Sequence, residues 1–174
     1  MGKNKITTKQ ITTISVLIAL SLIAFMIENL FPPILVPGAK IGISNLFSFF
    51  ALFTLSPTSA IIIVVAKTLL SCFIVGNLSM LMYSFTAGVL SIFLAILLKF
   101  LFYPKISVVS ISVCSAVVHN LVQNLVFCLV TSSTYMLAYF PYLGICGVIS
   151  GIIVGVTLQL TLRVMPLKLY NQLS

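Results

Sequence analysis

The sequence predicts an all-α integral membrane protein in which six transmembrane helices form a single domain, residues 1–174. Hydrophobic residues make up 61% of the chain and charged residues only 6%, whereas an ordinary soluble domain has about 25% charged residues. Six apolar segments are separated by proline or glycine-asparagine breaks, and most lysines lie at the segment ends. This placement is typical of residues that set membrane topology.

The first helix is expected from about Ile11 to Phe31, where Pro32-Pro33 stop it. Its charged-then-apolar order is similar to that of a signal peptide, but no small-residue cleavage site follows, so we expect an uncleaved membrane helix. The second helix, about Ile43 to Leu55, ends at Ser56-Pro57. It is shorter than the ~20 residues that span a bilayer, and we expect it to be re-entrant or to lie at a thinned edge.

Four longer helices complete the expected bundle. The third and fourth are joined by a Gly76-Asn77 turn, and the sixth lies between Pro141 and Pro166, which are residue types that commonly mark element boundaries. Their expected bounds are about Ser59 to Val75, Leu78 to Phe102, Ile106 to Thr131 and Tyr142 to Met165.

Lysine and arginine placement predicts that both termini lie in the cytoplasm of the cell, with the protein in the cell membrane. In this orientation Lys40 alone lies outside, Lys67 lies within the membrane, and the other seven basic residues lie inside: Lys3, Lys5, Lys9, Lys99, Lys105, Arg163 and Lys168. No basic run or stripe is present, which argues against nucleic-acid binding.

Two helices carry small residues at four-residue spacing, a pattern that allows close helix packing. Gly147, Gly151 and Gly155 recur on the sixth helix, and we expect them to pack inside the protein. Ser15 and Ala19 recur on the first helix, and we expect them to contact another membrane protein.

Lys67 lies in the middle of the apolar segment AIIIVVAKTLLSCFIVG. A lysine at the bilayer centre costs roughly 2.5–3.5 kcal/mol on insertion scales, so it marks a functional site or a buried pair. His119 and Gln123 lie four residues apart on the fifth helix, with Asn120 and Asn124 beside them. The side chains of the two asparagines could instead form hydrogen bonds between helices.

The remaining polar candidates lie at the expected outer side: Glu28 ends the first helix, Lys40 and Asn45 flank the first loop, and Ser84 lies on the fourth helix. Together with Lys67 they predict an outward-opening polar cavity. Its cationic balance favours a ligand with phosphate or carboxylate groups. An ion pair between Lys67 and Glu28 is the alternative role for the lysine.

The sequence lacks the residues that several classes of catalytic and metal site require. The chain has no Asp, and Glu28 is its only acidic residue, so paired-carboxylate catalysis and Asp-rich magnesium sites are excluded. The sequence also contains no phosphate-binding glycine loop and no metal-ligand spacing. Its four cysteines form no C-x-x-C pair and are expected to be small buried apolar residues. We therefore expect a protein without cofactors that is not an enzyme.

The stretch PGAKIGISNLFSFFALF resembles the P-G-x-K-x-G-x-x-N signature of the Gx transporter family, whose members are often described as heptaprenyl diphosphate synthase component I. HNLVQ in the fifth helix and the glycines of the sixth fit the same pattern, so the resemblance covers essentially the whole chain. Family members more often have Arg at the position of Lys67. The lysine keeps the positive charge but cannot bind a ligand in the bidentate geometry of an arginine.

The resemblance implies an S component of an energy-coupling factor (ECF) transporter: a six-helix, membrane-embedded protein that binds a vitamin-like molecule from outside. Such proteins dock through small residues of the first helix, here Ser15 and Ala19, onto a T component driven by two ATPases. A branch of the family is associated with flavin-based extracellular electron transfer.

Two other interpretations stay open at this point. The protein could be a membrane subunit of a redox, quinone or isoprenoid-related complex, which co-purification with such proteins would indicate. It could also be a proton-coupled carrier that works alone, for which His119 and Glu28 are the available titrating groups. Co-purification with a T component and paired ATPases would favour the S component.

Overall fold

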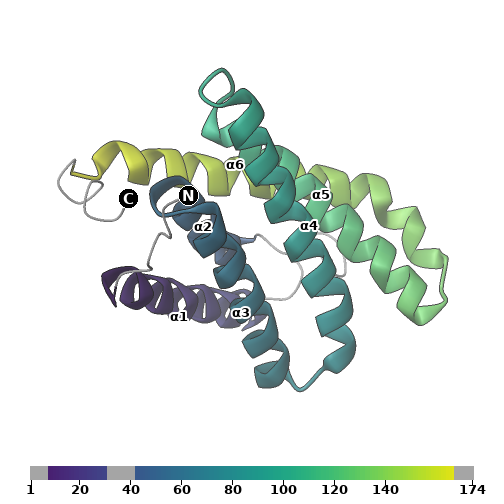
Figure 1. Ribbon diagram of the computed structural model, residues 1–174. Coiled ribbons are helices and arrows are strands. Elements are labelled where there is room, and N and C mark those ends of the chain that lie inside the picture. The colour runs from purple at the N-terminus through teal and green to yellow at the C-terminus, as the bar shows by residue number, and fades with distance from the viewer. Residues whose placement is uncertain (1–7, 31–41, 167–174) are drawn as a thin grey trace.

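The computed structural model describes residues 8–30 and 42–166, and this part of the chain forms helices joined by short turns, without strands. Figure 1 shows the helices packed as one bundle. In chain order the elements are α1 (Thr8–Leu30), α2 (Ile43–Thr54), α3 (Pro57–Val75), α4 (Leu78–Phe102), α5 (Val108–Thr131), the 3₁₀ helix η1 (Tyr135–Tyr139) and α6 (Phe140–Val164). The predicted all-helical fold is confirmed.

Five of the six described α-helices are long and apolar enough to cross a membrane, and α2 is the exception. Its 12 residues extend about 18 Å at 1.5 Å per residue, well short of the roughly 30 Å hydrocarbon core. The prediction of a short second helix is therefore confirmed. It packs mainly against α1 and α3, and less extensively against α6.

Three helix starts differ from the sequence-based bounds by two residues. α3 and α6 each include a proline in their first turn, Pro57 and Pro141, where the missing N–H has no helical partner to lose. Ser56 completes the α3 start by accepting the backbone N–H of Ser59 at 3.1 Å. On α5, Ser107 is the N-cap, so this helix begins two residues later than expected.

The glycines of α6 lie directly against the backbone of α5. A Cβ atom at Gly151 would lie 2.5 Å from the Cα of Val113 on α5, and at Gly147 and Gly155 it would lie 2.8 Å from other valine Cα atoms of α5. These distances leave no room for a side chain, so the backbones of α5 and α6 touch along this seam. The expectation that these glycines pack inside the protein is confirmed.

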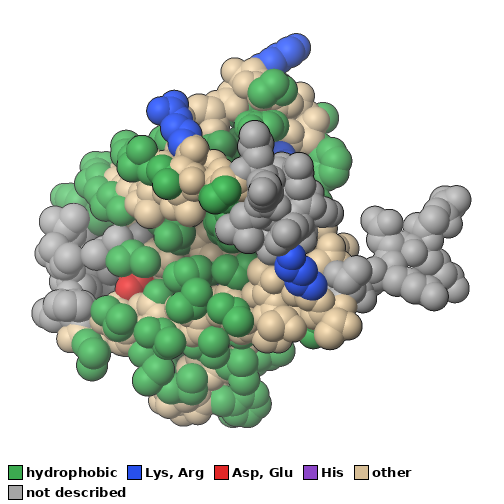
Figure 2. All heavy atoms as spheres, turned by 90° about the vertical axis from the view of Figure 1, so that its left-hand side faces the viewer, with side chains coloured by type: hydrophobic (Ala, Val, Ile, Leu, Met, Phe, Trp, Pro, Cys, Tyr) green, Lys and Arg blue, Asp and Glu red, His purple; other side chains and the backbone are tan. Residues whose placement is uncertain are grey.

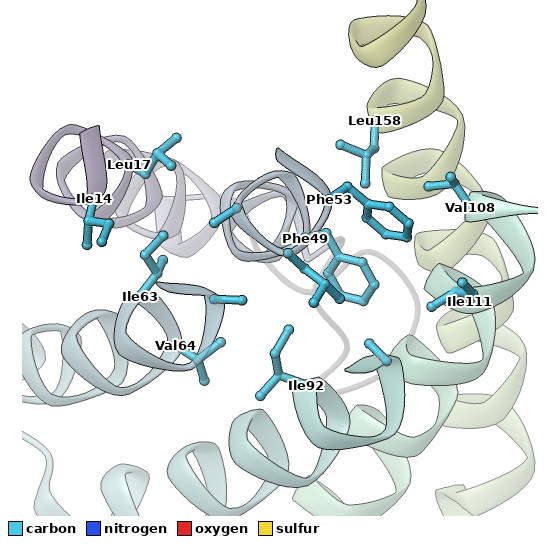
Figure 3. Close-up of a cluster of buried hydrophobic side chains, with 14 residues drawn as sticks. Ile14, Leu17, Phe49, Phe53, Ile63, Val64, Ile92, Val108, Ile111 and Leu158 are labelled. Atoms are coloured by element: carbon cyan, nitrogen blue, oxygen red, sulfur yellow. The ribbon is translucent and has the colours of Figure 1, made fainter. Parts of the chain in front are cut away.

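A single apolar cluster fills one end of the bundle, which we call the core end. Figure 3 shows its side chains converging from all six helices. They come from the first halves of α1, α3 and α5 and the second halves of α2, α4 and α6, because successive helices run in opposite directions. Its labelled members are Ile14, Leu17, Phe49, Phe53, Ile63, Val64, Ile92, Val108, Ile111 and Leu158.

The outer surface of the bundle is also apolar. Large hydrophobic side chains are exposed along every long helix, such as Phe73, Phe100 and Leu129, and hydrophobic side chains cover much of the face in Figure 2. Such a surface suits lipid contact and identifies a multi-pass membrane protein.

All four cysteines are free, but Cys114 is exposed. The expectation that all four are buried is therefore wrong for Cys114, which lies on an outward face of α5.

The glycine seam gives a direct test of the α5–α6 contact. Gly151→Ala should lower the free energy of unfolding by about 1–3 kcal/mol, because its methyl group would overlap the backbone at Val113. Gly144→Ala is the matched control on α6, since nothing lies within 4 Å of a Cβ there. Thermal unfolding in detergent measures both variants, and equal stability of the two would contradict the seam.

Candidate functional site

A polar cavity occupies the end of the bundle opposite the core end, which we call the cavity end. Its volume is about 50 Å³, and a water needs roughly 10–15 Å³ of such space, so it holds a few waters. A larger ligand must widen it. The lining residues come from all six helices: Phe25, Glu28, Gly42, Ser44, Asn45, Lys67, Thr68, Ser71, Met80, Ser84, Gly88, Ala116, His119, Asn120, Gln123 and Ser150.

Lys67 is the central cation of this cavity, and its side chain is only 8% exposed. Its ammonium donates to Asn45 Oδ1 on α2 at 2.6 Å, with a longer approach of 3.5 Å to Ser44 Oγ. A hydrogen bond to a charged group contributes roughly 1.5–3 kcal/mol, comparable with the roughly 2.5–3.5 kcal/mol insertion cost of a lysine. The hydrogen-bond acceptors that stabilise the Lys67 ammonium on α3 are therefore supplied by α2.

The first turn of α2 is held by the two neighbouring helices. Glu28 Oε1 on α1 accepts the backbone N–H of Ile43 at 2.7 Å, and Ser21 Oγ, also on α1, donates to the Ser44 carbonyl at 2.7 Å. Gly42 precedes the turn at φ 77°, in the left-handed region that favours glycine. With Lys67, these contacts fix three successive residues of α2.

Helix α5 contributes polar groups with two different roles. His119 Nδ1 lies 3.3 Å from Ser91 Oγ on α4, and Gln123 lines the cavity one turn further along. Asn120 donates to the Leu143 carbonyl of α6 at 3.2 Å, and Asn124 donates to the Met136 carbonyl of η1 at 2.9 Å. The expected role of the two asparagines as bonds between segments is confirmed, and Asn120 lines the cavity as well.

Sequence reasoning identified Ser84 but missed the other hydroxyl groups of the cavity. Thr68, Ser71 and Ser150 line it, and all three are buried. Single serines and threonines are common in membrane helices and carry little signal by themselves. Their spacing is the signal that could have found them, because Lys67 and Ser71 are one turn apart and Thr68 is adjacent.

A smaller chamber of about 20 Å³ adjoins the main cavity on its core side. The two share lining residues, among them Asn45, His119 and Ser150. The chamber adds three buried serines of α4 and α5, Ser91, Ser112 and Ser115. Phe49 and Val154 close it, and beyond them lies the apolar cluster of the core end.

The structure brings most of the predicted site residues together. Six of them line the cavity: Glu28, Asn45, Lys67, Ser84, His119 and Gln123. Lys40 lies outside the described residues. Ser15 and Ala19 lie apart from the cavity, exposed on the outer face of α1. Within the described residues no three His, Cys, Asp or Glu side chains gather as metal ligands would.

Residues 17–161 match the sequence profile of the family described as heptaprenyl diphosphate synthase component I. The chain belongs to this family. The resemblance read from the loop signature and the fifth and sixth helices is thereby confirmed. No curated protein sequence shows significant similarity to this family member.

A solved structure described as the S component of a bacterial ECF transporter is similar to this family member. The TM-score is 0.69 at 25% sequence identity, and the match covers 95% of this chain and 98% of the other. The likeness therefore extends over the whole bundle, including the helices that form the cavity.

The hold of α1 on α2 can be tested with two serines of one helix. Ser21→Ala should lower the free energy of unfolding by about 0.5–1.5 kcal/mol, because it removes a buried hydrogen bond between helices. Ser15→Ala should leave it unchanged, since that exposed hydroxyl bonds only to its own helix. Chemical denaturation in detergent provides the measurement, and an equal effect of both substitutions would argue against the contact.

Proposed function

We propose that this protein is the substrate-binding S component of an ECF-type importer in the cell membrane. In this role it binds a small anionic, vitamin-like molecule from outside. The observation that carries the proposal is the polar cavity around buried Lys67, within a fold similar to that of an S component.

The distribution of polar groups supports a binding role. The cavity-end halves of the helices carry the lysine, histidine, amide and hydroxyl groups, whereas the core-end halves meet in an apolar cluster. A ligand can thus be received at one end of the bundle without a polar path to the other. This is the behaviour expected of a binding subunit that depends on partners for transport.

Lys67 is the group that we propose as the ligand anchor. Its ammonium donates to Asn45 Oδ1 at 2.6 Å and approaches Ser44 Oγ at 3.5 Å, and it lies among groups from five other helices. An anion in the cavity would compensate its charge in a site of low dielectric constant, where such contacts are strong. Waters can hydrate it when the cavity is empty.

The family description names a synthase component, but the residues favour binding over catalysis. Prenyl-diphosphate chemistry uses several carboxylates to hold magnesium and diphosphate. This chain has one acidic residue, Glu28, and its Oε1 accepts the backbone N–H of Ile43. We therefore propose a protein that is not an enzyme.

The proposed partners are a T component and two ATPase subunits. The exposed face of α1 fits this role, because Ser15 and Ala19 are small and lie beside exposed Val16 and Leu20. Small residues allow the backbone of a partner helix to approach closely. Energy for import would come from the ATPases, since this chain has no nucleotide-binding loop.

If Lys67 anchors the ligand, replacing it should reduce ligand binding. Lys67→Met should weaken binding by about 2–5 kcal/mol, because it leaves the ligand's anionic group without its buried partner. The probe is the dialysable small-molecule fraction of yeast extract, and mass spectrometry identifies compounds that the purified protein retains. Lys99→Met is the matched control, because that half-buried lysine donates to the Leu52 carbonyl at 2.7 Å, away from the cavity.

Retention by wild type and Lys99→Met but not by Lys67→Met is the expected result. If Lys67→Met retains the same compounds as the wild type, the anchor role is wrong. If Lys67→Met alone is unstable and Lys67→Met with Glu28→Gln recovers stability, the lysine is the ion-pair partner of Glu28 instead.

If the outer face of α1 docks onto the T component, enlarging a side chain there should reduce association with the partners. Ala19→Leu should reduce co-purification with the T component and ATPases of the source organism, because a larger side chain holds the partner helix away. Cys114→Leu enlarges an exposed side chain on α5 and is the matched control. Undiminished association of Ala19→Leu would exclude this face, and co-purification with quinone-biosynthetic or flavin-carrying proteins would favour a redox complex.

A further inference from the structure

The exposed tyrosines of the described residues lie at the two ends of the bundle. Tyr135, Tyr139 and Tyr142 are exposed at the cavity end, on η1 and the first turn of α6. Tyr103 is exposed at the core end, directly after α4. The large exposed side chains along the middle of α6 are aliphatic instead, such as Ile149. Tyrosines at both ends of a membrane bundle are typical of the two membrane–water interfaces, because the ring is apolar and the hydroxyl is polar.

The basic side chains distinguish the same two ends. Lys99, Lys105 and Arg163 lie at the core end, in the last turns of α4 and α6 and in the turn that follows α4. Residues 106–162, in contrast, contain no Asp, Glu, Lys or Arg. The cavity end of α5, η1 and α6 therefore has no charged side chain to fix its depth in the bilayer. The tyrosines are the interfacial residues that this end does have.

The length of α6 places the cavity-end tyrosines at a bilayer boundary. Tyr142 and Arg163 are 21 residues apart, or about 32 Å along a helix, which is close to the roughly 30 Å thickness of the hydrocarbon core. If Arg163 lies at the core-side boundary, Tyr142 reaches the opposite boundary. The apolar stretch Tyr135–Val164 is thus longer than one crossing requires, and η1 falls beyond the hydrocarbon.

Two features of the chain before α6 fit a headgroup layer. The turn that leads into η1 is TSST, residues 131–134, and three of these four hydroxyl residues are exposed. The Met136 carbonyl of η1 accepts a hydrogen bond from buried Asn124 on α5 at 2.9 Å. This contact fixes η1 to the protein on one side, whereas Tyr135 is 87% exposed on another.

We propose that residues 131–142 are an interfacial segment that binds the lipid headgroup layer at the cavity end, and that α6 enters the hydrocarbon at about Leu143. Lipid fits this surface because it continues into exposed aliphatic side chains of α6, among them Ile145 and Ile149. The segment is also joined to the cavity wall, since Asn120 lines the cavity and donates to the Leu143 carbonyl.

Single tryptophans test this inference directly, because the chain contains none. Tyr135→Trp and Tyr142→Trp each place one fluorophore on the interfacial segment. Phe93→Trp is the matched control, since Phe93 is an exposed aromatic residue near the middle of α4. Each variant is reconstituted into phosphatidylcholine vesicles whose lipids carry bromine either near the headgroup or near the chain end. The two segment variants should lose more fluorescence to bromine near the headgroup, and Phe93→Trp more to bromine near the chain end.

Three other results would overturn the inference. Stronger quenching of the segment variants by chain-end bromine would place residues 131–142 in the hydrocarbon. Quenching by aqueous iodide but by neither lipid would place them in water above the membrane. Protection from all three quenchers would mean that protein covers the segment, for instance a second copy of this chain. None of these results depends on ligand binding, so the inference can fail while the proposed function stands.

Discussion

The hydrogen bond between Lys67 and Asn45 is the interaction on which the arrangement of the bundle depends. It links the middle of α3 to the first turn of α2, a helix too short to cross a membrane and to be positioned by lipid alone. The other end of α2 is held similarly, because Lys99 on α4 donates to the Leu52 carbonyl at 2.7 Å and lies 5.0 Å above the Phe53 ring. Two lysines, one in the middle of α3 and one in the last turn of α4, thus hold the two ends of α2.

Fixing α2 in this way divides the protein into two regions of opposite polarity. Its first turn contributes Ser44 and Asn45 to the cavity, and its second half contributes Phe49 and Phe53 to the apolar cluster. Since each of the six helices contributes residues to both the cavity lining and the apolar cluster, the cavity is closed on its core side by packed side chains. The cavity has a volume of about 50 Å³, which holds only a few waters.

The helices and the main polar residues could be predicted from the sequence because each rests on a strong local signal. A lysine or histidine in an apolar segment is costly enough to be informative, and Lys67 and His119 do line the cavity. The buried hydroxyls could not be predicted with equal ease, since a serine can bond to its own helix anywhere, as Ser15 and Ser71 both do. The role of Lys99 could not be predicted, because its hydrogen-bond acceptor is a backbone carbonyl 47 residues away. No pattern of side chains in the sequence indicates such a contact.

Helix α1 is the element that the two proposed surfaces share. Its 23 residues extend about 35 Å, and its second half places Phe25 and Glu28 in the cavity wall. Its first half presents Ser15 and Ala19 outward. A movement of the Glu28 backbone would also move the proposed docking face, because both lie on this one helix. Helix α1 therefore joins the cavity wall to the proposed docking face along one continuous helix, and its buried Ile14 and Leu17 also belong to the apolar cluster.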